Sequence, residues 1–329
     1  MRSGGTSGTL SRRTALVTGV LALTAVAAGC GTRDSATTED GSTSVEHQYG
    51  TTTIPAKPRT VVSMAGNWTD TLLALNVPIR AEFVTTGYAG KDNRFAWTPP
   101  HESEVLEMTF ANAVDPERIA KFEPDLILAG YLNDQAAYER LSKIAPTLPI
   151  LDRAAVVDTW QTVATTAGKI FGLTTEAEAL IGRTEQLIRT TTSTYPAANG
   201  ATFAFGQLTP DRQFGLVADT RDAAARLAGA LGLRLLPALE QFGQGKRVLV
   251  SVERADLLAS DLLLIWPLRG GPESFDTIPG WHDLPAVRSG AITYLTNDDA
   301  AAFASPSVLS VPYAVDRITP ALRQLRREQ

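Results

Sequence analysis

The sequence has 329 residues, enough for about two domains at ~150 residues each. Hydrophobic residues make up 44% and charged residues 20%, which excludes a disordered chain, a collagen-like repeat and a polytopic membrane protein. The single cysteine excludes an intramolecular disulfide and a zinc or iron–sulfur site built from several cysteines, and the formal charge of −5 argues against non-specific nucleic-acid binding.

The first thirty residues have the pattern of an export signal. Arg2, Arg12 and Arg13 supply a positive start, and residues 14–28 form an uncharged apolar stretch of 15 residues. Such a stretch is too short to span a hydrocarbon core of ~30 Å but suits a signal peptide. Residues 1–29 are therefore predicted to be a signal peptide.

The cysteine lies directly behind this apolar stretch. The segment Ala27-Ala28-Gly29-Cys30 resembles a lipobox, in which the signal peptide is cut before the cysteine and the thiol carries a diacylglycerol. The alternatives are an uncleaved anchor or a free cysteine. Residues 11–16 also resemble a twin-arginine motif, so that the general secretory and twin-arginine routes both stay open.

The residues after Cys30 are small and polar, rich in threonine and serine, and cannot bury a core. Residues 30–45 are predicted to be a lipidated flexible tether. Removal of the signal would take away three arginines and no acid, which changes the formal charge from −5 to −8. We expect an exported protein, anchored by lipid to the outer face of the cytoplasmic membrane.

Residues 46–156 show the alternation of strands and helices that is typical of an α/β lobe. The expected strands are 60–64, 79–84, 126–130 and 148–151, and the expected helices are 68–75, 116–122 and 135–144. This order implies a parallel sheet covered on both faces. Residues 85–104 form a long loop, and loops of that length are often functional.

Residues 157–195 are predicted to be a bridging helical segment. Gly172 separates a helix at 160–171 from a second helix, which Thr175 and Glu178 begin with a capping box. The second helix carries one apolar stripe, made of Leu180, Ile181, Leu187 and Ile188.

Residues 196–329 repeat the α/β pattern and form a predicted C-terminal lobe. Strands are expected at 202–205, 262–265 and 291–295, and a helix at 222–231. A terminal helical segment at 305–327 contains Pro312 and Pro320, which should bend or interrupt it. Two lobes joined by a helix leave a cleft, where small ligands tend to bind.

Four stretches, in the same order over about residues 46–326, resemble the iron–siderophore substrate-binding proteins of ABC importers. They are Thr52–Ser63, Asp115–Leu128, Pro279–Val287 followed by Gly290 and Tyr294, and Ser310–Asp316. The resemblance implies two lobes, each a mostly parallel sheet flanked by helices, joined by one long rigid helix that keeps lobe closure modest. It also implies a monomer that captures a ferric siderophore and delivers it to permease subunits.

The resemblance also assigns candidate docking residues. The family meets arginines of its permease through one glutamate on each lobe, and Glu117 and Glu253 occupy the matching places. Exposed carboxylates on a rigid body can fix orientation through charge-assisted pairs. The alternative is that both acids only complement helix dipoles.

Ligand contacts are expected from loops that face the cleft, because aromatic walls and arginine forks suit a flat polar chelate. The candidates are Trp68, Tyr88, Arg94, Trp97 and Tyr131 in the N-terminal lobe and Arg212, Phe214, Trp266, Arg269 and Phe303 in the C-terminal lobe. Each of them could instead be a packing residue or a surface charge. Trp160, Trp281 and Tyr313 are expected in the core.

The sequence offers few residues for a metal site and no motif that is typical of an enzyme. His47 lies near the tether, His101 in the long loop and His282 in a framework motif, so all three are interpreted as structural. We predict no cofactor and no metal site, since iron would arrive inside its chelator. No dinucleotide fingerprint, phosphate loop or nucleophile elbow is present, so no enzyme is predicted. The alternatives are haem or cobalamin on the same scaffold, a bare metal ion, a metal chaperone or an adhesin.

Overall fold

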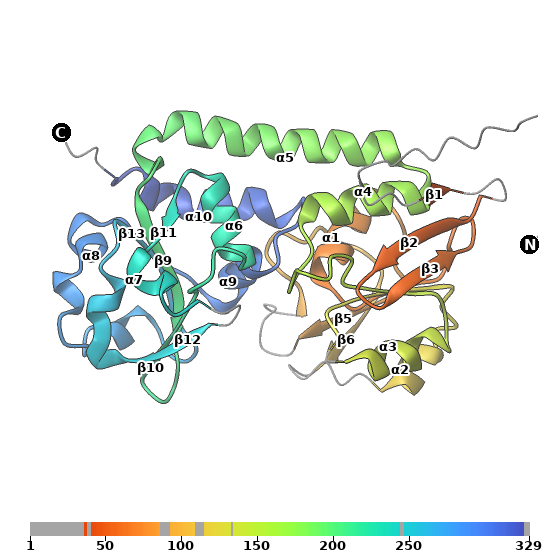
Figure 1. Cartoon of the computed structure of the whole chain (residues 1–329), viewed down its shortest axis with the longest axis horizontal. Helices are drawn as coiled ribbons and strands as arrows, with labels where there is room; N and C mark the ends of the chain where they lie inside the picture. Colours follow the sequence, from red (N-terminus) through yellow and green to blue (C-terminus); the bar gives the residue numbers. More distant parts are fainter. Residues whose placement is uncertain are drawn as a thin grey trace, which may run out of the picture. The chain divides into compact units, whose positions relative to one another are not determined.

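The computed structural model of the chain describes residues 36–37, 41–85, 93–108, 115–132, 134–243 and 247–325. All of them belong to one compact unit, Asp34–Gln329. Within this unit two sheets flanked by helices form two lobes (Figure 1). Cys30 and the predicted signal peptide lie outside the described residues.

The N-terminal lobe is built on a five-stranded sheet in which every neighbouring pair is parallel. The strand order is β6 (Glu104–Met108), β5 (Ala81–Thr85), β4 (Val61–Ser63), β7 (Leu126–Gly130) and β8 (Thr147–Pro149). A separate antiparallel sheet precedes it, made of β1 (Ala36–Thr37), β2 (Thr43–His47) and β3 (Gly50–Ile54).

Both faces of the parallel sheet are buried, as expected for strands joined by crossover helices. Along β7, Leu126 and Leu128 pack into one core cluster and Ile127 into another, because successive side chains point to opposite faces. The helices of this lobe are α1 (Gly66–Ala74), α2 (Pro116–Ala120), α3 (Gln135–Ser142) and α4 (Trp160–Phe171).

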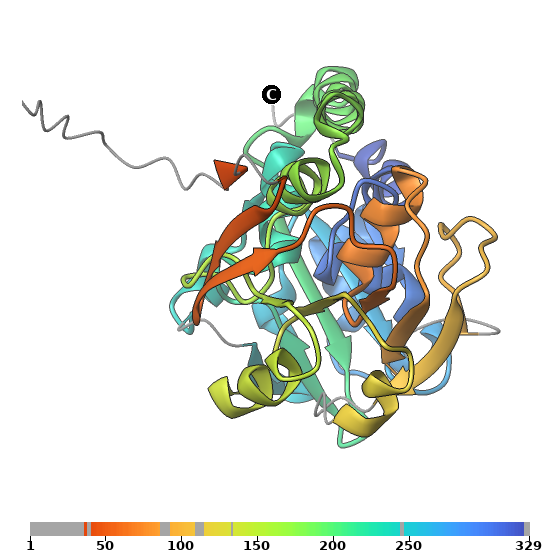
Figure 2. The same cartoon turned by 90° about the vertical axis from the view of Figure 1, so that its right-hand side faces the viewer.

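Helix α5 (Thr174–Thr194, 21 residues) runs from one lobe to the other, along the top of Figure 1, and Figure 2 shows it nearly end-on. Its Ala177 belongs to the core of the N-terminal lobe, whereas Leu187 and Ile188 pack on the core of the C-terminal lobe. Leu180 contacts both cores. The predicted long bridging helix is therefore present as α5.

Helix α4 also contacts both lobes. Val163 and Ile170 belong to the core of the N-terminal lobe, while Trp160 and Ala164 belong to the core of the C-terminal lobe. Trp160 is thus a packing residue, as predicted. Gly172 ends α4 in the left-handed conformation, with φ of 67°, that glycine adopts readily.

The C-terminal lobe is built on a mixed six-stranded sheet. Its main path is β12 (Val248–Ser251), β10 (Gln213–Leu216), β9 (Thr202–Leu208), β13 (Leu262–Pro267) and β14 (Ile292–Tyr294), with β11 (Arg234–Leu235) beside β9. The helices are α6 (Ala223–Ala230), α7 (Pro237–Glu240), α8 (Pro285–Ser289), α9 (Asn297–Ala304) and α10 (Ser310–Leu322), and the short 3-10 turns are η2 (Pro196–Ala198), η3 (Val252–Leu258), η4 (Pro272–Phe275) and η5 (Trp281–Asp283).

The structure differs from the sequence-based expectations at both ends of the folded region. Strand β2 begins at Thr43 and Val45 is 2% exposed, so the folded region starts before the expected boundary at residue 46. His47 lies in this strand and is buried, not in a tether. At the other end α10 is continuous over Ser310–Leu322, so neither proline interrupts it. Pro312 lies in the first turn, where its missing N–H is not needed, and Pro320 lies inside the helix close to its C-terminal end.

Candidate functional site

A cavity of about 250 Å³ lies at the carboxyl ends of the parallel strands of the N-terminal lobe. Residues directly after β4 and β7 line it, together with Glu82–Thr85 of β5 and Met108 of β6. Ala301, Ala304 and Ser305 of the C-terminal lobe close it from the other side. Open α/β sheets bind ligands at this edge, where the strands end and the loops diverge. The cavity therefore lies between the two lobes.

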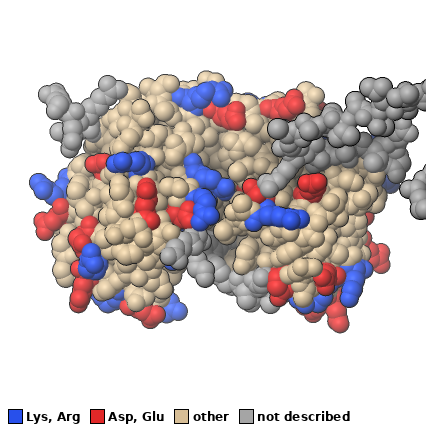
Figure 3. All heavy atoms as spheres, viewed as in Figure 1, with Lys and Arg blue, Asp and Glu red and all other residues tan. Residues whose placement is uncertain are grey.

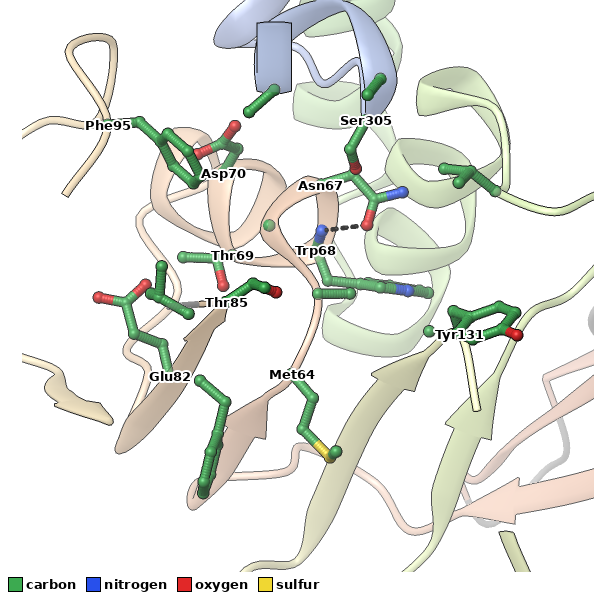
Figure 4. Close-up of a pocket in the computed structure, with 18 of the residues that line it drawn as sticks. Met64, Asn67, Trp68, Thr69, Asp70, Glu82, Thr85, Phe95, Tyr131 and Ser305 are labelled. Carbon is green, nitrogen blue, oxygen red and sulfur yellow. Dashed lines mark hydrogen bonds between the residues drawn. The ribbon is translucent and has the colours of Figure 1, made fainter. Parts of the chain in front are cut away.

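Aromatic side chains form much of its wall. Trp68, at the start of α1, is fully buried behind the cavity, and Phe95 stacks on Trp97 with ring centroids 4.5 Å apart and an interplanar angle of 6°. Tyr131, which follows β7, is 48% exposed and Val156 is 62% exposed (Figure 4). Exposed apolar side chains on a cavity wall are typical of a binding surface.

One carboxyl group of this cavity is completely buried. Asp70 in α1 accepts hydrogen bonds through Oδ2 from Trp97 Nε1 at 2.8 Å and from Ser307 Oγ at 2.5 Å. Burial raises the pKa of Asp70 to about 7, although the hydrogen bonds from Ser307 and Trp97 oppose the rise. The cavity wall at this point is a hydrogen-bonded contact between the lobes.

Three other charged side chains of the cavity, those of Glu82, Arg94 and Asp158, are also hydrogen-bonded. Glu82 Oε1 lies 2.6 Å from His101 Nε2 and accepts a hydrogen bond from Ser103 Oγ at 2.8 Å. Arg94 donates to the His101 carbonyl at 2.9 Å. Asp158 accepts from the backbone N–H groups of Leu151 and Asp152, and burial raises its pKa.

A second cavity of about 340 Å³ adjoins the first and shares Val156, Val157 and Ala304 with it. Its C-lobe wall carries two arginines, each facing an aspartate. Arg221 Nη2 lies 2.7 Å from Asp219 Oδ2, and Arg247 Nε lies 4.0 Å from Asp222 Oδ2. The guanidinium of Arg247 also lies over the rings of Phe205 and Trp266. The cleft thus has an aromatic half and a charged half.

The structure brings together four of the ten predicted ligand residues: Trp68, Arg94, Trp97 and Tyr131 line the first cavity. Tyr88 lies outside the described residues.

The five C-lobe candidates lie elsewhere. Phe214, Trp266 and Phe303 are at most 1% exposed and pack in the hydrophobic core, so they have no surface to offer a ligand. Arg212 and Arg269 are exposed and line neither described cavity; Arg212 donates to Thr277 Oγ1 at 3.3 Å. Arg221 and Arg247 line the cleft instead, and no aromatic or motif pattern in the sequence distinguishes them from other arginines.

The two predicted docking glutamates are exposed and lie on different lobes. Glu117 is in the first turn of α2, and its N–H is capped by Asp115 Oδ1 at 2.9 Å. Glu253 opens η3 directly after β12, where Ser251 caps its N–H at 3.3 Å. Helix α2 and strand β12 both lie on the side away from α5 (Figure 1).

The described residues contain neither a cluster of metal-ligating side chains nor a membrane-spanning helix. No group of three or more His, Cys, Asp or Glu side chains among them could hold a metal ion. No helix in the described part of the chain is both long and apolar enough to cross a bilayer.

A family model described as periplasmic binding protein matches residues 61–298. The chain belongs to this family. The match covers both lobes and α5, and membership means a binding protein rather than an enzyme. The predicted two-lobe α/β architecture is confirmed.

Two curated relatives are similar over part of the chain. The ferric enterobactin-binding periplasmic protein FepB of Escherichia coli is 32% identical over 132 residues, which cover 37% of this chain and 40% of FepB. The probable siderophore-binding lipoprotein YfiY of Bacillus subtilis is 29% identical over 129 residues, covering 37% and 38%. These matches span less than half the length of either relative.

Solved structures match over nearly their whole length. A periplasmic solute binding protein of Mycobacterium smegmatis superposes with a TM-score of 0.72 at 26% identity, over 87% of this chain and 99% of that one. PiaA of Streptococcus pneumoniae, solved in complex with ferrichrome, superposes with a TM-score of 0.67 at 21% identity, over 86% and 99%. The second likeness is one of fold.

Proposed function

We propose that this chain is an extracytoplasmic substrate-binding lipoprotein that captures a ferric siderophore between its lobes and delivers it to an ABC importer. The observation that carries the proposal is the aromatic cavity at the strand ends, closed by residues of the other lobe. The names of FepB and YfiY, which refer to ferric enterobactin and to a siderophore, point to the same ligand class.

Within this proposal Arg94, Trp97 and Tyr131 contact the chelate, and the fully buried ring of Trp68 supports the wall behind them. Arg221 and Arg247 face the chelate from the C-terminal lobe. The aromatic faces of Trp97 and Tyr131 suit the flat apolar periphery of a chelate. The iron needs no protein ligand, because its own chelator fills its coordination sphere.

The binding test uses intrinsic tryptophan fluorescence, since Trp68 and Trp97 lie at the cavity. Titration with ferric hydroxamates, ferric catecholates, haem and cobalamin should give saturable quenching with ferric siderophores. Saturable quenching by haem or cobalamin alone would replace the siderophore with that ligand. No quenching by any of them would refute the proposal.

We further propose that Glu117 and Glu253 dock on the two permease subunits. Both carboxylates are exposed, one on each lobe, and neither glutamate lines the cavity. The double variant Glu117→Ala/Glu253→Ala should keep chelate binding and lose uptake of iron-59 from the chelate. A matched control is Glu176→Ala/Glu178→Ala, which removes two exposed acids from α5. Unchanged uptake in the first double variant would remove the docking role.

Cys30 is the proposed lipid attachment point. Growth with a radiolabelled fatty acid should label the wild-type protein and leave Cys30→Ala unlabelled. Label that persists in Cys30→Ala would exclude this site.

A further inference from the structure

The two cavities form one cleft, because they share Val156, Val157 and Ala304. A ligand that fills the cleft therefore meets the charges of both. The net charge of the cleft lining therefore affects which ferric chelates bind, because these chelates differ in charge.

The N-lobe half of the cleft has one guanidinium and three carboxyl groups among its described residues: Arg94, Asp70, Glu82 and Asp158. Arg94 already donates to a backbone carbonyl, that of His101. The raised pKa of Asp70 lowers its negative charge near neutral pH but adds no positive charge. This half therefore offers no excess of positive charge.

The C-lobe half is balanced. Arg221 forms a bidentate pair with Asp219, with Nε 3.0 Å from Oδ1 and Nη2 2.7 Å from Oδ2. Arg247 faces Asp222 at 4.0 Å. An anionic ligand that approaches either guanidinium also meets the negative charge of an aspartate that stays in the cleft.

Figure 3 shows a similar balance on the outer surface. Basic and acidic side chains are interspersed over the described part of that face, and no extended patch of one sign is visible there. The surface drawn therefore provides no single-sign field to steer an anion into the cleft.

Ferric chelates differ sharply in charge. Iron(III) held by three hydroxamates has no net charge, since each hydroxamate carries one negative charge. Iron(III) held by three catecholates is triply negative, since each catecholate carries two. Moving an unbalanced charge out of water is costly unless opposite charges compensate it.

We infer that the cleft selects an uncharged or cationic ferric chelate, of the trihydroxamate class, over the anionic tris-catecholate class. The inference rests on the proposed function and narrows it. Its basis is the described cleft lining, in which five carboxyl groups outnumber three guanidinium groups and both C-lobe guanidiniums face aspartates.

The test compares two probes on the full-length protein, ferrichrome as an uncharged trihydroxamate and ferric enterobactin as a trianionic tris-catecholate. Calorimetric titration should give a dissociation constant at least about tenfold lower for ferrichrome. Equal or tighter binding of ferric enterobactin would overturn the inference and leave the proposed function standing. Binding of neither probe nor any other ferric siderophore would overturn both.

A pair of variants tests the cause. Asp219→Asn/Asp222→Asn removes both aspartates that face the C-lobe arginines, and asparagine keeps the N-cap that Asp222 provides for α6. The dissociation constant of ferric enterobactin divided by that of ferrichrome should fall by about tenfold or more. Asp211→Asn/Asp316→Asn removes the same charge from exposed positions that line neither cavity and should leave the ratio unchanged. Equal ratios in both double variants would refute the role of the paired aspartates.

Discussion

Ser307 donates a hydrogen bond to Asp70, and the donor and acceptor oxygens, 2.5 Å apart, come from different lobes. Ser307 lies just before α10 and also accepts the backbone N–H of Ser310 at 2.8 Å. Trp97 completes the arrangement, since its ring lies 5.2 Å from that of Tyr313 in α10 while its Nε1 donates to Asp70. The lobes are thus joined at the cavity by specific polar contacts.

Ser307→Ala should therefore destabilise the fold. The change leaves a fully buried carboxyl with one hydrogen bond fewer, which costs about 1–3 kcal/mol. Chemical denaturation at neutral pH measures the free energy of unfolding. Ser193→Ala, on the exposed face of α5, is the matched control and should change it by less than about 0.5 kcal/mol. Equal effects of the two variants would contradict a stabilising role for the contact.

Asp70 should make the fold less stable as pH rises. Its pKa is about 7 in the folded protein and 3.8 in an unperturbed aspartate, so between these limits the folded state holds a proton that the unfolded state has lost. The free energy of unfolding attributable to Asp70 therefore falls as pH rises from about 4 to about 7, by on the order of 2–4 kcal/mol.

The measurement is the free energy of unfolding of wild type and Asp70→Asn across that window. Asparagine cannot titrate, so the difference between the two proteins should change with pH. A constant difference would show that Asp70 does not have the raised pKa.

His47 should have the opposite dependence. Burial, with a smaller contribution from Arg153, lowers its pKa from 6.5 to about 4. Its Nδ1 accepts the N–H of Tyr49 at 3.2 Å, which fits the neutral ring with a proton on Nε2. The unfolded state therefore binds a proton first, and stability is lost as pH falls from about 6.5 to about 4.

Between about pH 6.5 and about pH 4, His47→Gln should lose less free energy of unfolding than wild type, by on the order of 1–3 kcal/mol. Denaturation curves of the two proteins measure this difference. His282→Gln is the control, because the side chain of His282 is 68% exposed. A similar acid profile in wild type and His47→Gln would rule out the lowered pKa.

Gly168 and Gly182 should respond oppositely to alanine. A Cβ at Gly168 would lie 2.7 Å from Ala177 Cβ, where α4 crosses α5, whereas a Cβ at Gly182 meets nothing within 4 Å. Gly168→Ala should cost about 1–3 kcal/mol through overpacking. Gly182→Ala should stabilise α5 by up to about 1 kcal/mol. Thermal melts give both values, and a stable Gly168→Ala would show that the crossing can relax.

Tyr131→Ala should weaken binding of the chelate and preserve the fold. The ring is 48% exposed on the cavity wall, so its loss removes an apolar contact with the ligand. We expect a loss of about tenfold in affinity, measured by calorimetry. Phe242→Ala, 40% exposed and lining neither cavity, is the control and should bind as wild type does. Unchanged binding by Tyr131→Ala would exclude the ring from the site.

The sequence predicted the strands that are buried on both faces, because continuous apolar runs such as Leu126–Ala129 have few other uses. It missed β1, β2, β3, β6, β10, β11 and β12, which are two to five residues long, so their apolar pattern is weak. These strands are defined by pairing with distant residues, as β10 pairs with β9 and β12. Local patterns do not contain that information.

The site residues that lie just beyond the parallel strands were predicted correctly, and those that lie elsewhere were predicted less well. Tyr131 comes directly after β7, and Trp68 lies at the start of α1, the helix that follows β4. The ends of parallel strands can be located from sequence. Trp266 was predicted as a ligand residue for the same reason, because β13 was expected to end before it. The strand instead continues to Pro267, and the Trp266 ring packs in the core. Arg247 reaches the cleft only through tertiary packing.

Helix α4 packs against the cores of both lobes, and this affects how the protein unfolds. Because Val163 and Ile170 serve one core while Trp160 and Ala164 serve the other, neither lobe can melt without exposing apolar surface that belongs to its neighbour. Although each lobe is continuous in sequence, the two should denature together as a single cooperative unit. Calorimetry should then show one heat-absorption peak, with equal calorimetric and van't Hoff enthalpies.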